Sequence, residues 1–295
     1  MPLEAGAAAQ RLRATSRGRR ARDRALEVCA WAALIIALLP LTAIAAFLLA
    51  QGTRALSLEF FVSDPPGDLS ATGGGIRNAI VGTLLMTGLA TLIAVPVGIA
   101  LAVFSREIGG RVSASVRFVI DVLAGLPSIV VGIFVYSLVV VTTGHFSGLA
   151  GAVALAIIEL PVIVVATDEL LRLTDRRIDE GTRALGMLRW RSFAAVFIPT
   201  ALSGIMTGIL LAVSRAIGET APLIFTALGN NFFTLDMNEP MQAMPLLIYR
   251  NALNSAFPAA RDRAMGTALV LVILVLGFNL LGRWIAARAR PPEQR

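Results

Sequence analysis

The segment "IPTALSGIMTGILLAVSRAIGETAP", Ile198–Pro222, decides the fold because it is long and apolar enough to cross a lipid bilayer. Its only charged residues are Arg215 and Glu219, which stand four positions apart. Crossing the hydrocarbon core of a membrane takes about 20 mostly apolar residues. We therefore expect a membrane-spanning helix here, and a charged pair inside such a helix needs a structural or functional reason.

Five further stretches have the same character. Hydrophobic residues make up 56% of the 295-residue chain and charged residues only 15%, whereas soluble proteins contain about 25% charged residues. The sequence predicts an all-α integral membrane protein with six transmembrane helices. The other apolar stretches are Val28–Ala50, Ile80–Phe104, Phe118–Val141, Leu149–Ala166 and Ala264–Gly282.

These stretches divide the chain into segments. We expect an arginine-rich tail over residues 1–27, a first transmembrane helix over 28–50 and a loop rich in proline and glycine over 51–79. Residues 80–287 then form a core with five transmembrane helices, and residues 288–295 form a second tail.

The arginines predict the orientation of the chain in the membrane. Of the 26 basic residues, all of them arginine, 20 lie in residues 1–27, 104–118, 167–192 and 283–295, and five lie in the alternate loops. Loops rich in arginine stay on the cytoplasmic side. Both termini are therefore expected in the cytoplasm. This topology explains the net charge of +7 without a nucleic-acid partner, and the basic tail suits anionic membrane lipid.

Several kinds of chemistry are excluded by composition. A phosphate-binding P-loop needs a lysine, and the chain has none. A single cysteine, Cys29, and a single histidine, His145, exclude a disulfide within the chain and a Cys/His zinc site. We expect no cofactor or metal on this chain, and His145 is expected to be an exposed turn residue.

The charged pair shares one face of its helix with Gly204 and Gly208. At the helical period these four residues fall within about 60° of one another, and small residues mark the face on which another helix packs. A guanidinium binds oxyanions through a planar fork of donors. We predict an anion path in which Glu219 holds Arg215 and moderates its affinity. The alternative is that the pair neutralises itself and only fixes helix packing.

Other acidic residues are harder to interpret. Glu159 is in the middle of a predicted span with no basic residue near it in sequence, so it either pairs across helices or is protonated. It is a further candidate for the path. Asp121 follows Arg117 by four residues near the start of the third span, which predicts an ion pair at the membrane surface.

The stretch "EGTRALGMLRWRSFAAVFIP" resembles the cytoplasmic coupling loop of permeases from ABC importers. Glu180 occupies the first position of that pattern, Gly186 its glycine and Pro199 its end. Gly181 and Thr182 replace the two alanines of the family. The resemblance implies that residues 172–199 form the loop that contacts an ATPase subunit.

The stretches "LAGLPSIVVGIFVY" and "SGIMTGILLAVSRAIGETAPLIFTAL" resemble the phosphate-specific permeases of type I ABC importers, and the likeness extends over about residues 73–285. Val165 stands where those relatives often have a basic residue. The resemblance implies a transport subunit of the bacterial inner membrane rather than an enzyme. Its partners would be a homologous second permease, two ATPase subunits that hold ATP and Mg, and a periplasmic phosphate-binding protein.

Three alternatives remain open at this point. The first is a permease of the same family for another oxyanion, such as sulfate or molybdate. The second is a secondary anion transporter driven by protons, with Glu159 or Glu219 titrating; such proteins typically contain internal repeats, and none is evident. The third is an intramembrane enzyme, which would want a nucleophile–base pair or metal ligands within the membrane.

Overall fold

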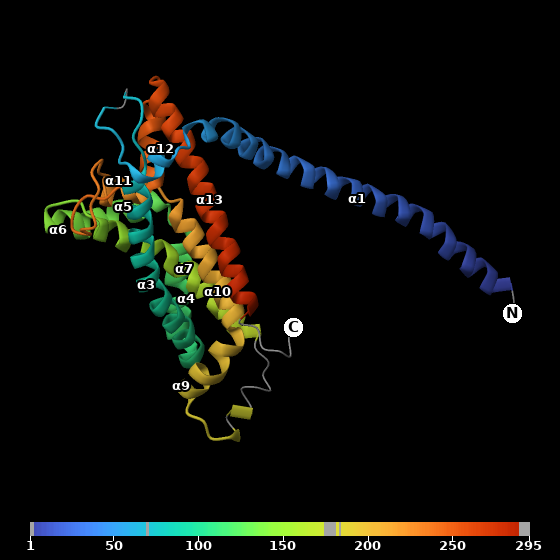
Figure 1. The fold of residues 1–295 in the computed structure, drawn as a ribbon. Helices are drawn as coiled ribbons and strands as arrows, with labels where there is room; N and C mark the ends of the chain where they lie inside the picture. Colours follow the sequence, from blue (N-terminus) through green and yellow to red (C-terminus); the bar gives the residue numbers. More distant parts are fainter. Residues whose placement is uncertain (1–2, 69–70, 174–180, 183, 289–295) are drawn as a thin grey trace. The chain divides into compact units, whose positions relative to one another are not determined.

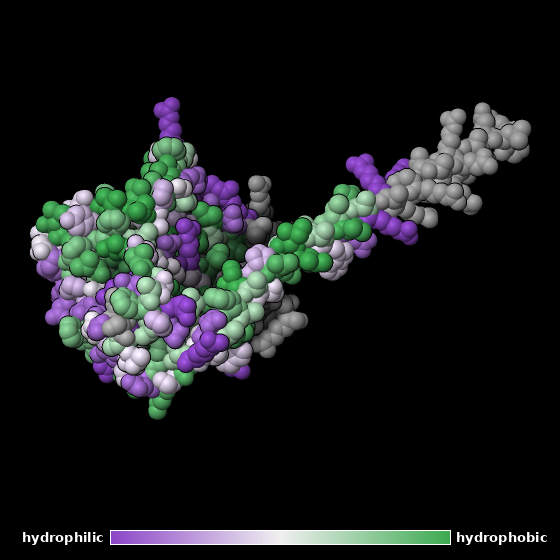
Figure 2. All heavy atoms as spheres, turned by 90° about the horizontal axis from the view of Figure 1, so that it is seen from above, coloured by the Kyte–Doolittle hydropathy of each residue, from purple (hydrophilic) through white to green (hydrophobic). Residues whose placement is uncertain are grey.

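The computed structural model describes residues 3–68, 71–173, 181–182 and 184–288. The chain forms two units, residues 1–50 and residues 51–295. From Leu3 onwards, the first unit consists of helix α1 (Leu3–Gly52), which is continuous and contains Pro40. Figure 2 shows its apolar part in green and the basic residues that precede it in purple. The candidate span in this region covers Arg22–Ala55.

Four long helices form the body of the second unit. They are α3 (Arg77–Ile108), α7 (Gly148–Leu173), α10 (Ile198–Ile217) and α13 (Pro258–Arg288). Helix α7 packs against both α3 and α10, and α10 packs in turn against α13 (Figure 1). These four helices and α1 are long and apolar enough to cross a membrane.

Small side chains line the contact between α3, α7 and α10. Such residues let helix backbones approach closely, so that dispersion contacts and not hydrophobic exclusion hold the helices together in lipid. The small buried members of this core are Ala90, Ala94, Ala156, Ala212 and Ala216.

The third predicted span is a bent pair of helices. Helix α4 (Gly110–Gly125) and helix α5 (Ser128–Val135) meet at an angle of 104°. The expectation of one helix over Phe118–Val141 is therefore wrong. Pro127 has no N–H to donate, and its ring disfavours helical geometry at the preceding residue, Leu126. The helix is therefore interrupted at Leu126 and Pro127, between the end of α4 and the start of α5. The described residues contain five candidate spans, or six if the bent pair counts as one.

The fifth predicted span also ends early. Helix α10 stops at Ile217, and Pro222 belongs to a separate short helix, α11 (Ala221–Thr226). The remaining short elements lie in the connections between the long helices. They are η1 (Thr53–Ala55), α2 (Leu58–Val62), η2 (Tyr136–Val140), α6 (Val141–Thr143), α9 (Arg189–Ser192), η3 (Phe193–Phe197) and α12 (Met244–Leu253).

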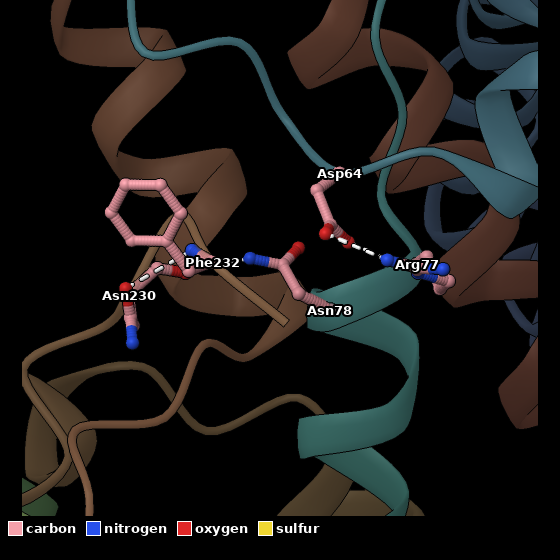
Figure 3. A network of polar contacts seen from close by, with 5 residues as sticks. All are labelled: Asp64, Arg77, Asn78, Asn230 and Phe232. Carbon is pink, nitrogen blue, oxygen red and sulfur yellow. Dashed lines mark hydrogen bonds and ion pairs between the residues drawn. The ribbon is translucent and has the colours of Figure 1, made fainter. Parts of the chain in front are cut away.

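The first residues of α3 tie two loops together (Figure 3). Arg77 Nη2 lies 2.8 Å from Asp64 Oδ2, and Arg77 Nε donates to Asp64 Oδ1 at 3.2 Å. The same guanidinium lies 4.5 Å from the centre of the Phe233 ring. Next to it, Asn78 Nδ2 donates to the carbonyl of Asn230 at 2.6 Å. The loop before α3 and the loop after α11 are thus fixed to the same end of the helix bundle.

Candidate functional site

Arg215 and Glu219 lie where α10 ends. Arg215 is in the last turn of the helix, and Glu219 belongs to the break that follows Ile217. Arg215 Nε lies 3.5 Å from Glu219 Oε1, which is a single, long contact. The Arg215 side chain is 53% exposed and the Glu219 side chain 16%. Glu219 therefore leaves most of the guanidinium uncovered, and the pair does not lie in a sealed core.

The uncovered part of Arg215 borders a hollow. Within the described part of the chain, no residue accepts a hydrogen bond from its terminal nitrogens, Nη1 and Nη2. The hollow has a volume of about 30 Å³, and a single water molecule needs about 10–15 Å³. It is lined by Leu123, Ala124, Leu126, Ser128, Val131, Ile158, Pro161, Val162 and Arg215.

Two glycines set the distance between α10 and α7. A methyl group on Gly204 would lie 2.5 Å from the Leu170 side chain, and one on Gly208 would lie 2.5 Å from the Ala166 Cβ. Real Cβ atoms do not approach other carbons so closely, so a larger residue at Gly208 would push the two helices apart, and one at Gly204 would displace the Leu170 side chain. The two glycines therefore face α7, one turn apart, along the same stripe of α10.

A second set of contacts fixes the other side of α10. Asn279 Nδ2 of α13 donates to Ser214 Oγ at 2.8 Å, directly beside Arg215. A methyl group on Gly282 would lie 2.2 Å from the Leu210 side chain, so α13 also approaches closely. Because α10 is held between α7 and α13, the direction in which Arg215 leaves the helix is fixed by packing.

The two helix breaks of the bundle lie next to each other. Helix α5 packs on α11, and a methyl group on Gly132 of α5 would lie 2.7 Å from the Pro222 Cα of α11. Arg215 stands at the break after α10 and lines the hollow at the break before α5. Irregular backbone at membrane depth is tolerated where it is buried in protein or lines an aqueous cavity. Broken helices of this kind form the substrate sites of many transporters.

Glu159 lies elsewhere in the bundle, between α7 and α3. It is 1% exposed and accepts a hydrogen bond from Thr91 Oγ1 at 3.3 Å, while the same hydroxyl donates to the Thr87 carbonyl at 2.8 Å. Its second oxygen, Oε2, has no hydrogen-bond partner among the residues described here. The structure does not bring Glu159 to the hollow beside Arg215, and its partner across the helices is a hydroxyl group.

The predicted ion pair between Arg117 and Asp121 is wrong. Arg117 Nη2 instead lies 3.3 Å from Asp168 Oδ1 of α7, and Arg172 Nη2 lies 2.9 Å from Asp168 Oδ2. The Asp168 side chain is 16% exposed, and Asp121 is exposed on α4. Because α4 packs on α7, Asp168 joins two guanidinium groups in a partly buried site, which gives more favourable pairing than an exposed neighbour along the helix.

The predicted coupling loop contains a tight turn. Leu185 N donates to the Gly181 carbonyl and Met187 N donates to the Thr182 carbonyl, each at 3.1 Å. Gly186 has a φ of +68°, in the left-handed region. This is the hydrogen-bond pattern that ends a helix with a glycine. Among the residues that the structure describes, none has an atom within 4 Å of the position of a Gly186 Cβ, apart from its chain neighbours.

The ends of the coupling loop differ in what the structure describes. Glu180 lies outside the described residues. Pro199 is exposed in the first turn of α10, and Thr182 is buried, with 7% of its surface exposed. The five-residue π-helical segment η3 joins the loop to α10. Such irregular turns are frequent at functional sites.

Sequence reasoning missed one feature of the site. A proline inside an apolar span, such as Pro127, most commonly indicates only a kink, and nothing in the sequence singles out Ser128. The available signal was the run Gly125-Leu126-Pro127, which combines a flexible residue with a helix breaker inside an apolar stretch. That signal indicates a break but does not say which other helix the break faces.

Comparison with known proteins decides the family. A model of the family described as binding-protein-dependent transport system inner membrane component matches residues 94–291. The chain belongs to this family. The permease is 42% identical, over 238 residues, to the phosphate transport system permease protein PstA of Pasteurella multocida, a match that covers 80% of this chain and 84% of the relative. It is 37% identical to the protein of that name from Yersinia pestis, with 92% of each chain covered.

Solved structures share the fold of the permease. A chain of an alginate ABC transporter, solved in complex with an alginate-bound periplasmic protein, matches with a TM-score of 0.64 at 16% identity and covers 90% of this chain and 96% of its own. A chain of the inward-facing MetNI methionine ABC transporter matches with a TM-score of 0.59 at 18% identity and covers 74% and 95%. The permease therefore has the helical fold of ABC importer permeases.

Proposed function

We propose that this permease forms half of the membrane pathway of an ATP-driven importer of inorganic phosphate. The names of its relatives support phosphate as the substrate. The observation that carries the proposal is the position of Arg215. Its side chain is 53% exposed and stands where two broken helices meet, and its terminal nitrogens have no hydrogen-bond partner among the described residues.

Arg215 would bind the oxyanion as it passes. A guanidinium stays charged at every physiological pH and offers parallel donors to two oxygens of one anion. Glu219 contacts only Nε, at 3.5 Å, so it orients the fork without occupying it. The nearby carboxylate also weakens the attraction for an anion, which lets the ion leave. Gly204 and Gly208 are the packing residues that hold this helix against α7.

Energy for transport would come from a partner subunit. The chain has no lysine and thus no P-loop of its own. The ATPase would bind the surface formed by residues 172–199, which include Glu180, Gly181, Thr182, Gly186 and Pro199. Closure of the ATPase dimer would push this loop and tilt α10 as a rigid body, with η3 as the adjustable joint. Arg215 is in the last turn of α10, so it would move with the helix.

The remaining partners follow from the same assignment. A PstC-like permease would complete the pathway, a PstB-like ATPase dimer would bind ATP and Mg at the cytoplasmic face, and a PstS-like binding protein would deliver phosphate from the periplasm. Both termini would lie in the cytoplasm, and the loops joined by Arg77 and Asp64 would lie outside. The arginine-rich tail would rest against anionic lipid of the inner membrane.

Uptake into vesicles tests this function. Vesicles that contain the complete complex and the loaded binding protein should accumulate labelled phosphate when ATP is inside, and vesicles without the ATPase subunit should not. Uptake that survives loss of the ATPase and follows a proton gradient would establish a secondary transporter instead. Preferential uptake of labelled sulfate or molybdate would assign the permease to another oxyanion.

A further inference from the structure

We propose that the hollow beside Arg215 is an oxyanion-binding subsite and that the hydroxyl group of Ser128 is its second ligand. This inference rests on the proposed function, because it adds a residue to the path that Arg215 defines. It concerns a side chain on the bent span, whereas Arg215 belongs to α10.

Ser128 and Arg215 are the polar side chains of an otherwise apolar hollow. The seven other lining residues are all hydrophobic. Ligand sites typically combine apolar walls with a few polar groups that fix the orientation of the ligand. Within the described residues, neither the Ser128 hydroxyl nor the terminal nitrogens of Arg215 have a hydrogen-bond partner.

The helix break explains why the Ser128 hydroxyl is free. Serine and threonine side chains within a helix usually donate to the carbonyl four residues earlier, as Ser137 does to Ile133 at 3.0 Å. Four residues before Ser128 is Ala124, which belongs to α4, on the other side of the 104° bend. The bend therefore removes the usual acceptor and leaves the hydroxyl available to a ligand.

The donors that line the hollow suit a tetrahedral oxyanion. A free hydroxyl donates one hydrogen bond to an anion oxygen, and the Arg215 fork donates to two others. The volume of about 30 Å³ corresponds to about two water molecules, so the hollow receives the oxygens on one face of the ion and does not enclose it. Apolar walls strengthen each of these hydrogen bonds. Incomplete enclosure suits a site that must release its ion in each cycle.

The first test removes the hydroxyl in the complete transporter. Ser128→Ala should lower phosphate uptake about tenfold, the size expected for one hydrogen bond to a charged group, and Ser128→Thr should restore most of it. The complex should still assemble with its ATPase subunits, so that the loss of uptake does not reflect a loss of assembly. Ser137→Ala is the matched control. It also deletes a hydroxyl group from the bent span, but that hydroxyl donates to a backbone carbonyl and is not free for a ligand.

The second test detects the ion at the site and does not depend on transport. In a Cys29→Ser background, which removes the only native cysteine of this chain, Ser128→Cys in the purified complex is labelled with a thiol reagent, and the label is counted on this subunit after the subunits are separated. Inorganic phosphate should slow labelling at least threefold relative to chloride of equal ionic strength. If Ser128→Ala transports like the Ser137→Ala control, or if phosphate gives no protection, Ser128 is not a ligand. In that case loss of uptake in Arg215→Gln still supports the proposed function, and normal uptake in Arg215→Gln would overturn both.

Discussion

Gly132 and Pro222 are in direct backbone contact: a methyl group on Gly132 would lie 2.7 Å from the Pro222 Cα. The contact joins α5 to α11, and each of these short helices follows a break in a longer apolar segment. The two breaks are therefore packed against each other without an intervening side chain at this point. Any tilt of α10 that reaches α11 is transmitted to the bent span on which Ser128 lies.

Replacing Gly132 should test this coupling of the two breaks. Gly132→Ala places a methyl group against backbone, which cannot rotate away as a side chain can, and overpacking of this kind costs about 1–3 kcal/mol. We expect a lower unfolding temperature of the purified complex and reduced phosphate uptake. Gly88→Ala on α3 is the matched control, since no atom of another described segment lies within 4 Å of its methyl group. Equal behaviour of the two variants would show that the close contact is not required.

Arg215 should be essential for uptake and dispensable for assembly. Arg215→Gln removes the charge, and we expect phosphate uptake to be abolished while the complex still purifies intact. Arg215→Lys keeps the charge but loses the planar fork, so its uptake should be intermediate. The exposed Arg261 provides a control in which the same change to glutamine removes one positive charge elsewhere. Wild-type uptake in Arg215→Gln would remove this residue from the path.

Hydropathy predicts the long spans of this chain because each needs about 20 apolar residues, a property visible in composition. Helices α3, α7 and α13 accordingly contain their predicted stretches in full, and α10 contains its stretch as far as Ile217. The break at Leu126–Pro127 could not be predicted in the same way, since a proline in a membrane helix commonly gives only a kink. Its geometry depends on α11, which supplies the surface against which α5 turns.

The same limit applies to the candidate site. The four-residue spacing of Arg215 and Glu219 predicts their contact, because residues at that spacing are neighbours on a helix. The same rule failed for Arg117 and Asp121, because packing of α4 on α7 offers Arg117 a carboxylate on another helix. Ser128 was missed because sequence does not show that its usual acceptor lies beyond a bend.

The shared carboxylate of Asp168 should contribute to stability. Asp168→Asn removes the carboxylate that both Arg117 and Arg172 contact, and ion pairs with solvent-exposed arginines contribute about 0.2–1 kcal/mol each. We expect a modest fall in the unfolding temperature at low salt that shrinks as salt is added. Asp121→Asn removes the same charge from the exposed face of α4 and should have no effect. A larger effect at Asp121 would contradict the pairing described above.

Glu159 separates a phosphate importer driven by ATP from a transporter driven by protons. Its contact in the described structure is the Thr91 hydroxyl and not a cation, so a neutral amide of the same shape satisfies the site at lower desolvation cost. Glu159→Gln should keep phosphate uptake within about twofold of wild type, because one hydrogen bond to Thr91 is replaced by another of similar strength. A proton-coupled mechanism that uses this carboxyl group predicts complete loss of uptake, with binding of phosphate preserved.

Gly186 offers a test of how the coupling loop meets the ATPase. Its φ of +68° is strained for most residues but tolerated by asparagine. If the loop needs only this backbone conformation, Gly186→Asn should retain ATPase binding and phosphate uptake, and Gly186→Val should lose both. If the partner instead requires the space around the glycine, which is open in this chain, both variants should lose the ATPase. Co-purification of the ATPase with each variant, together with ATP-driven uptake, distinguishes the two outcomes. Retention of ATPase and uptake by Gly186→Val would refute the docking role of this turn.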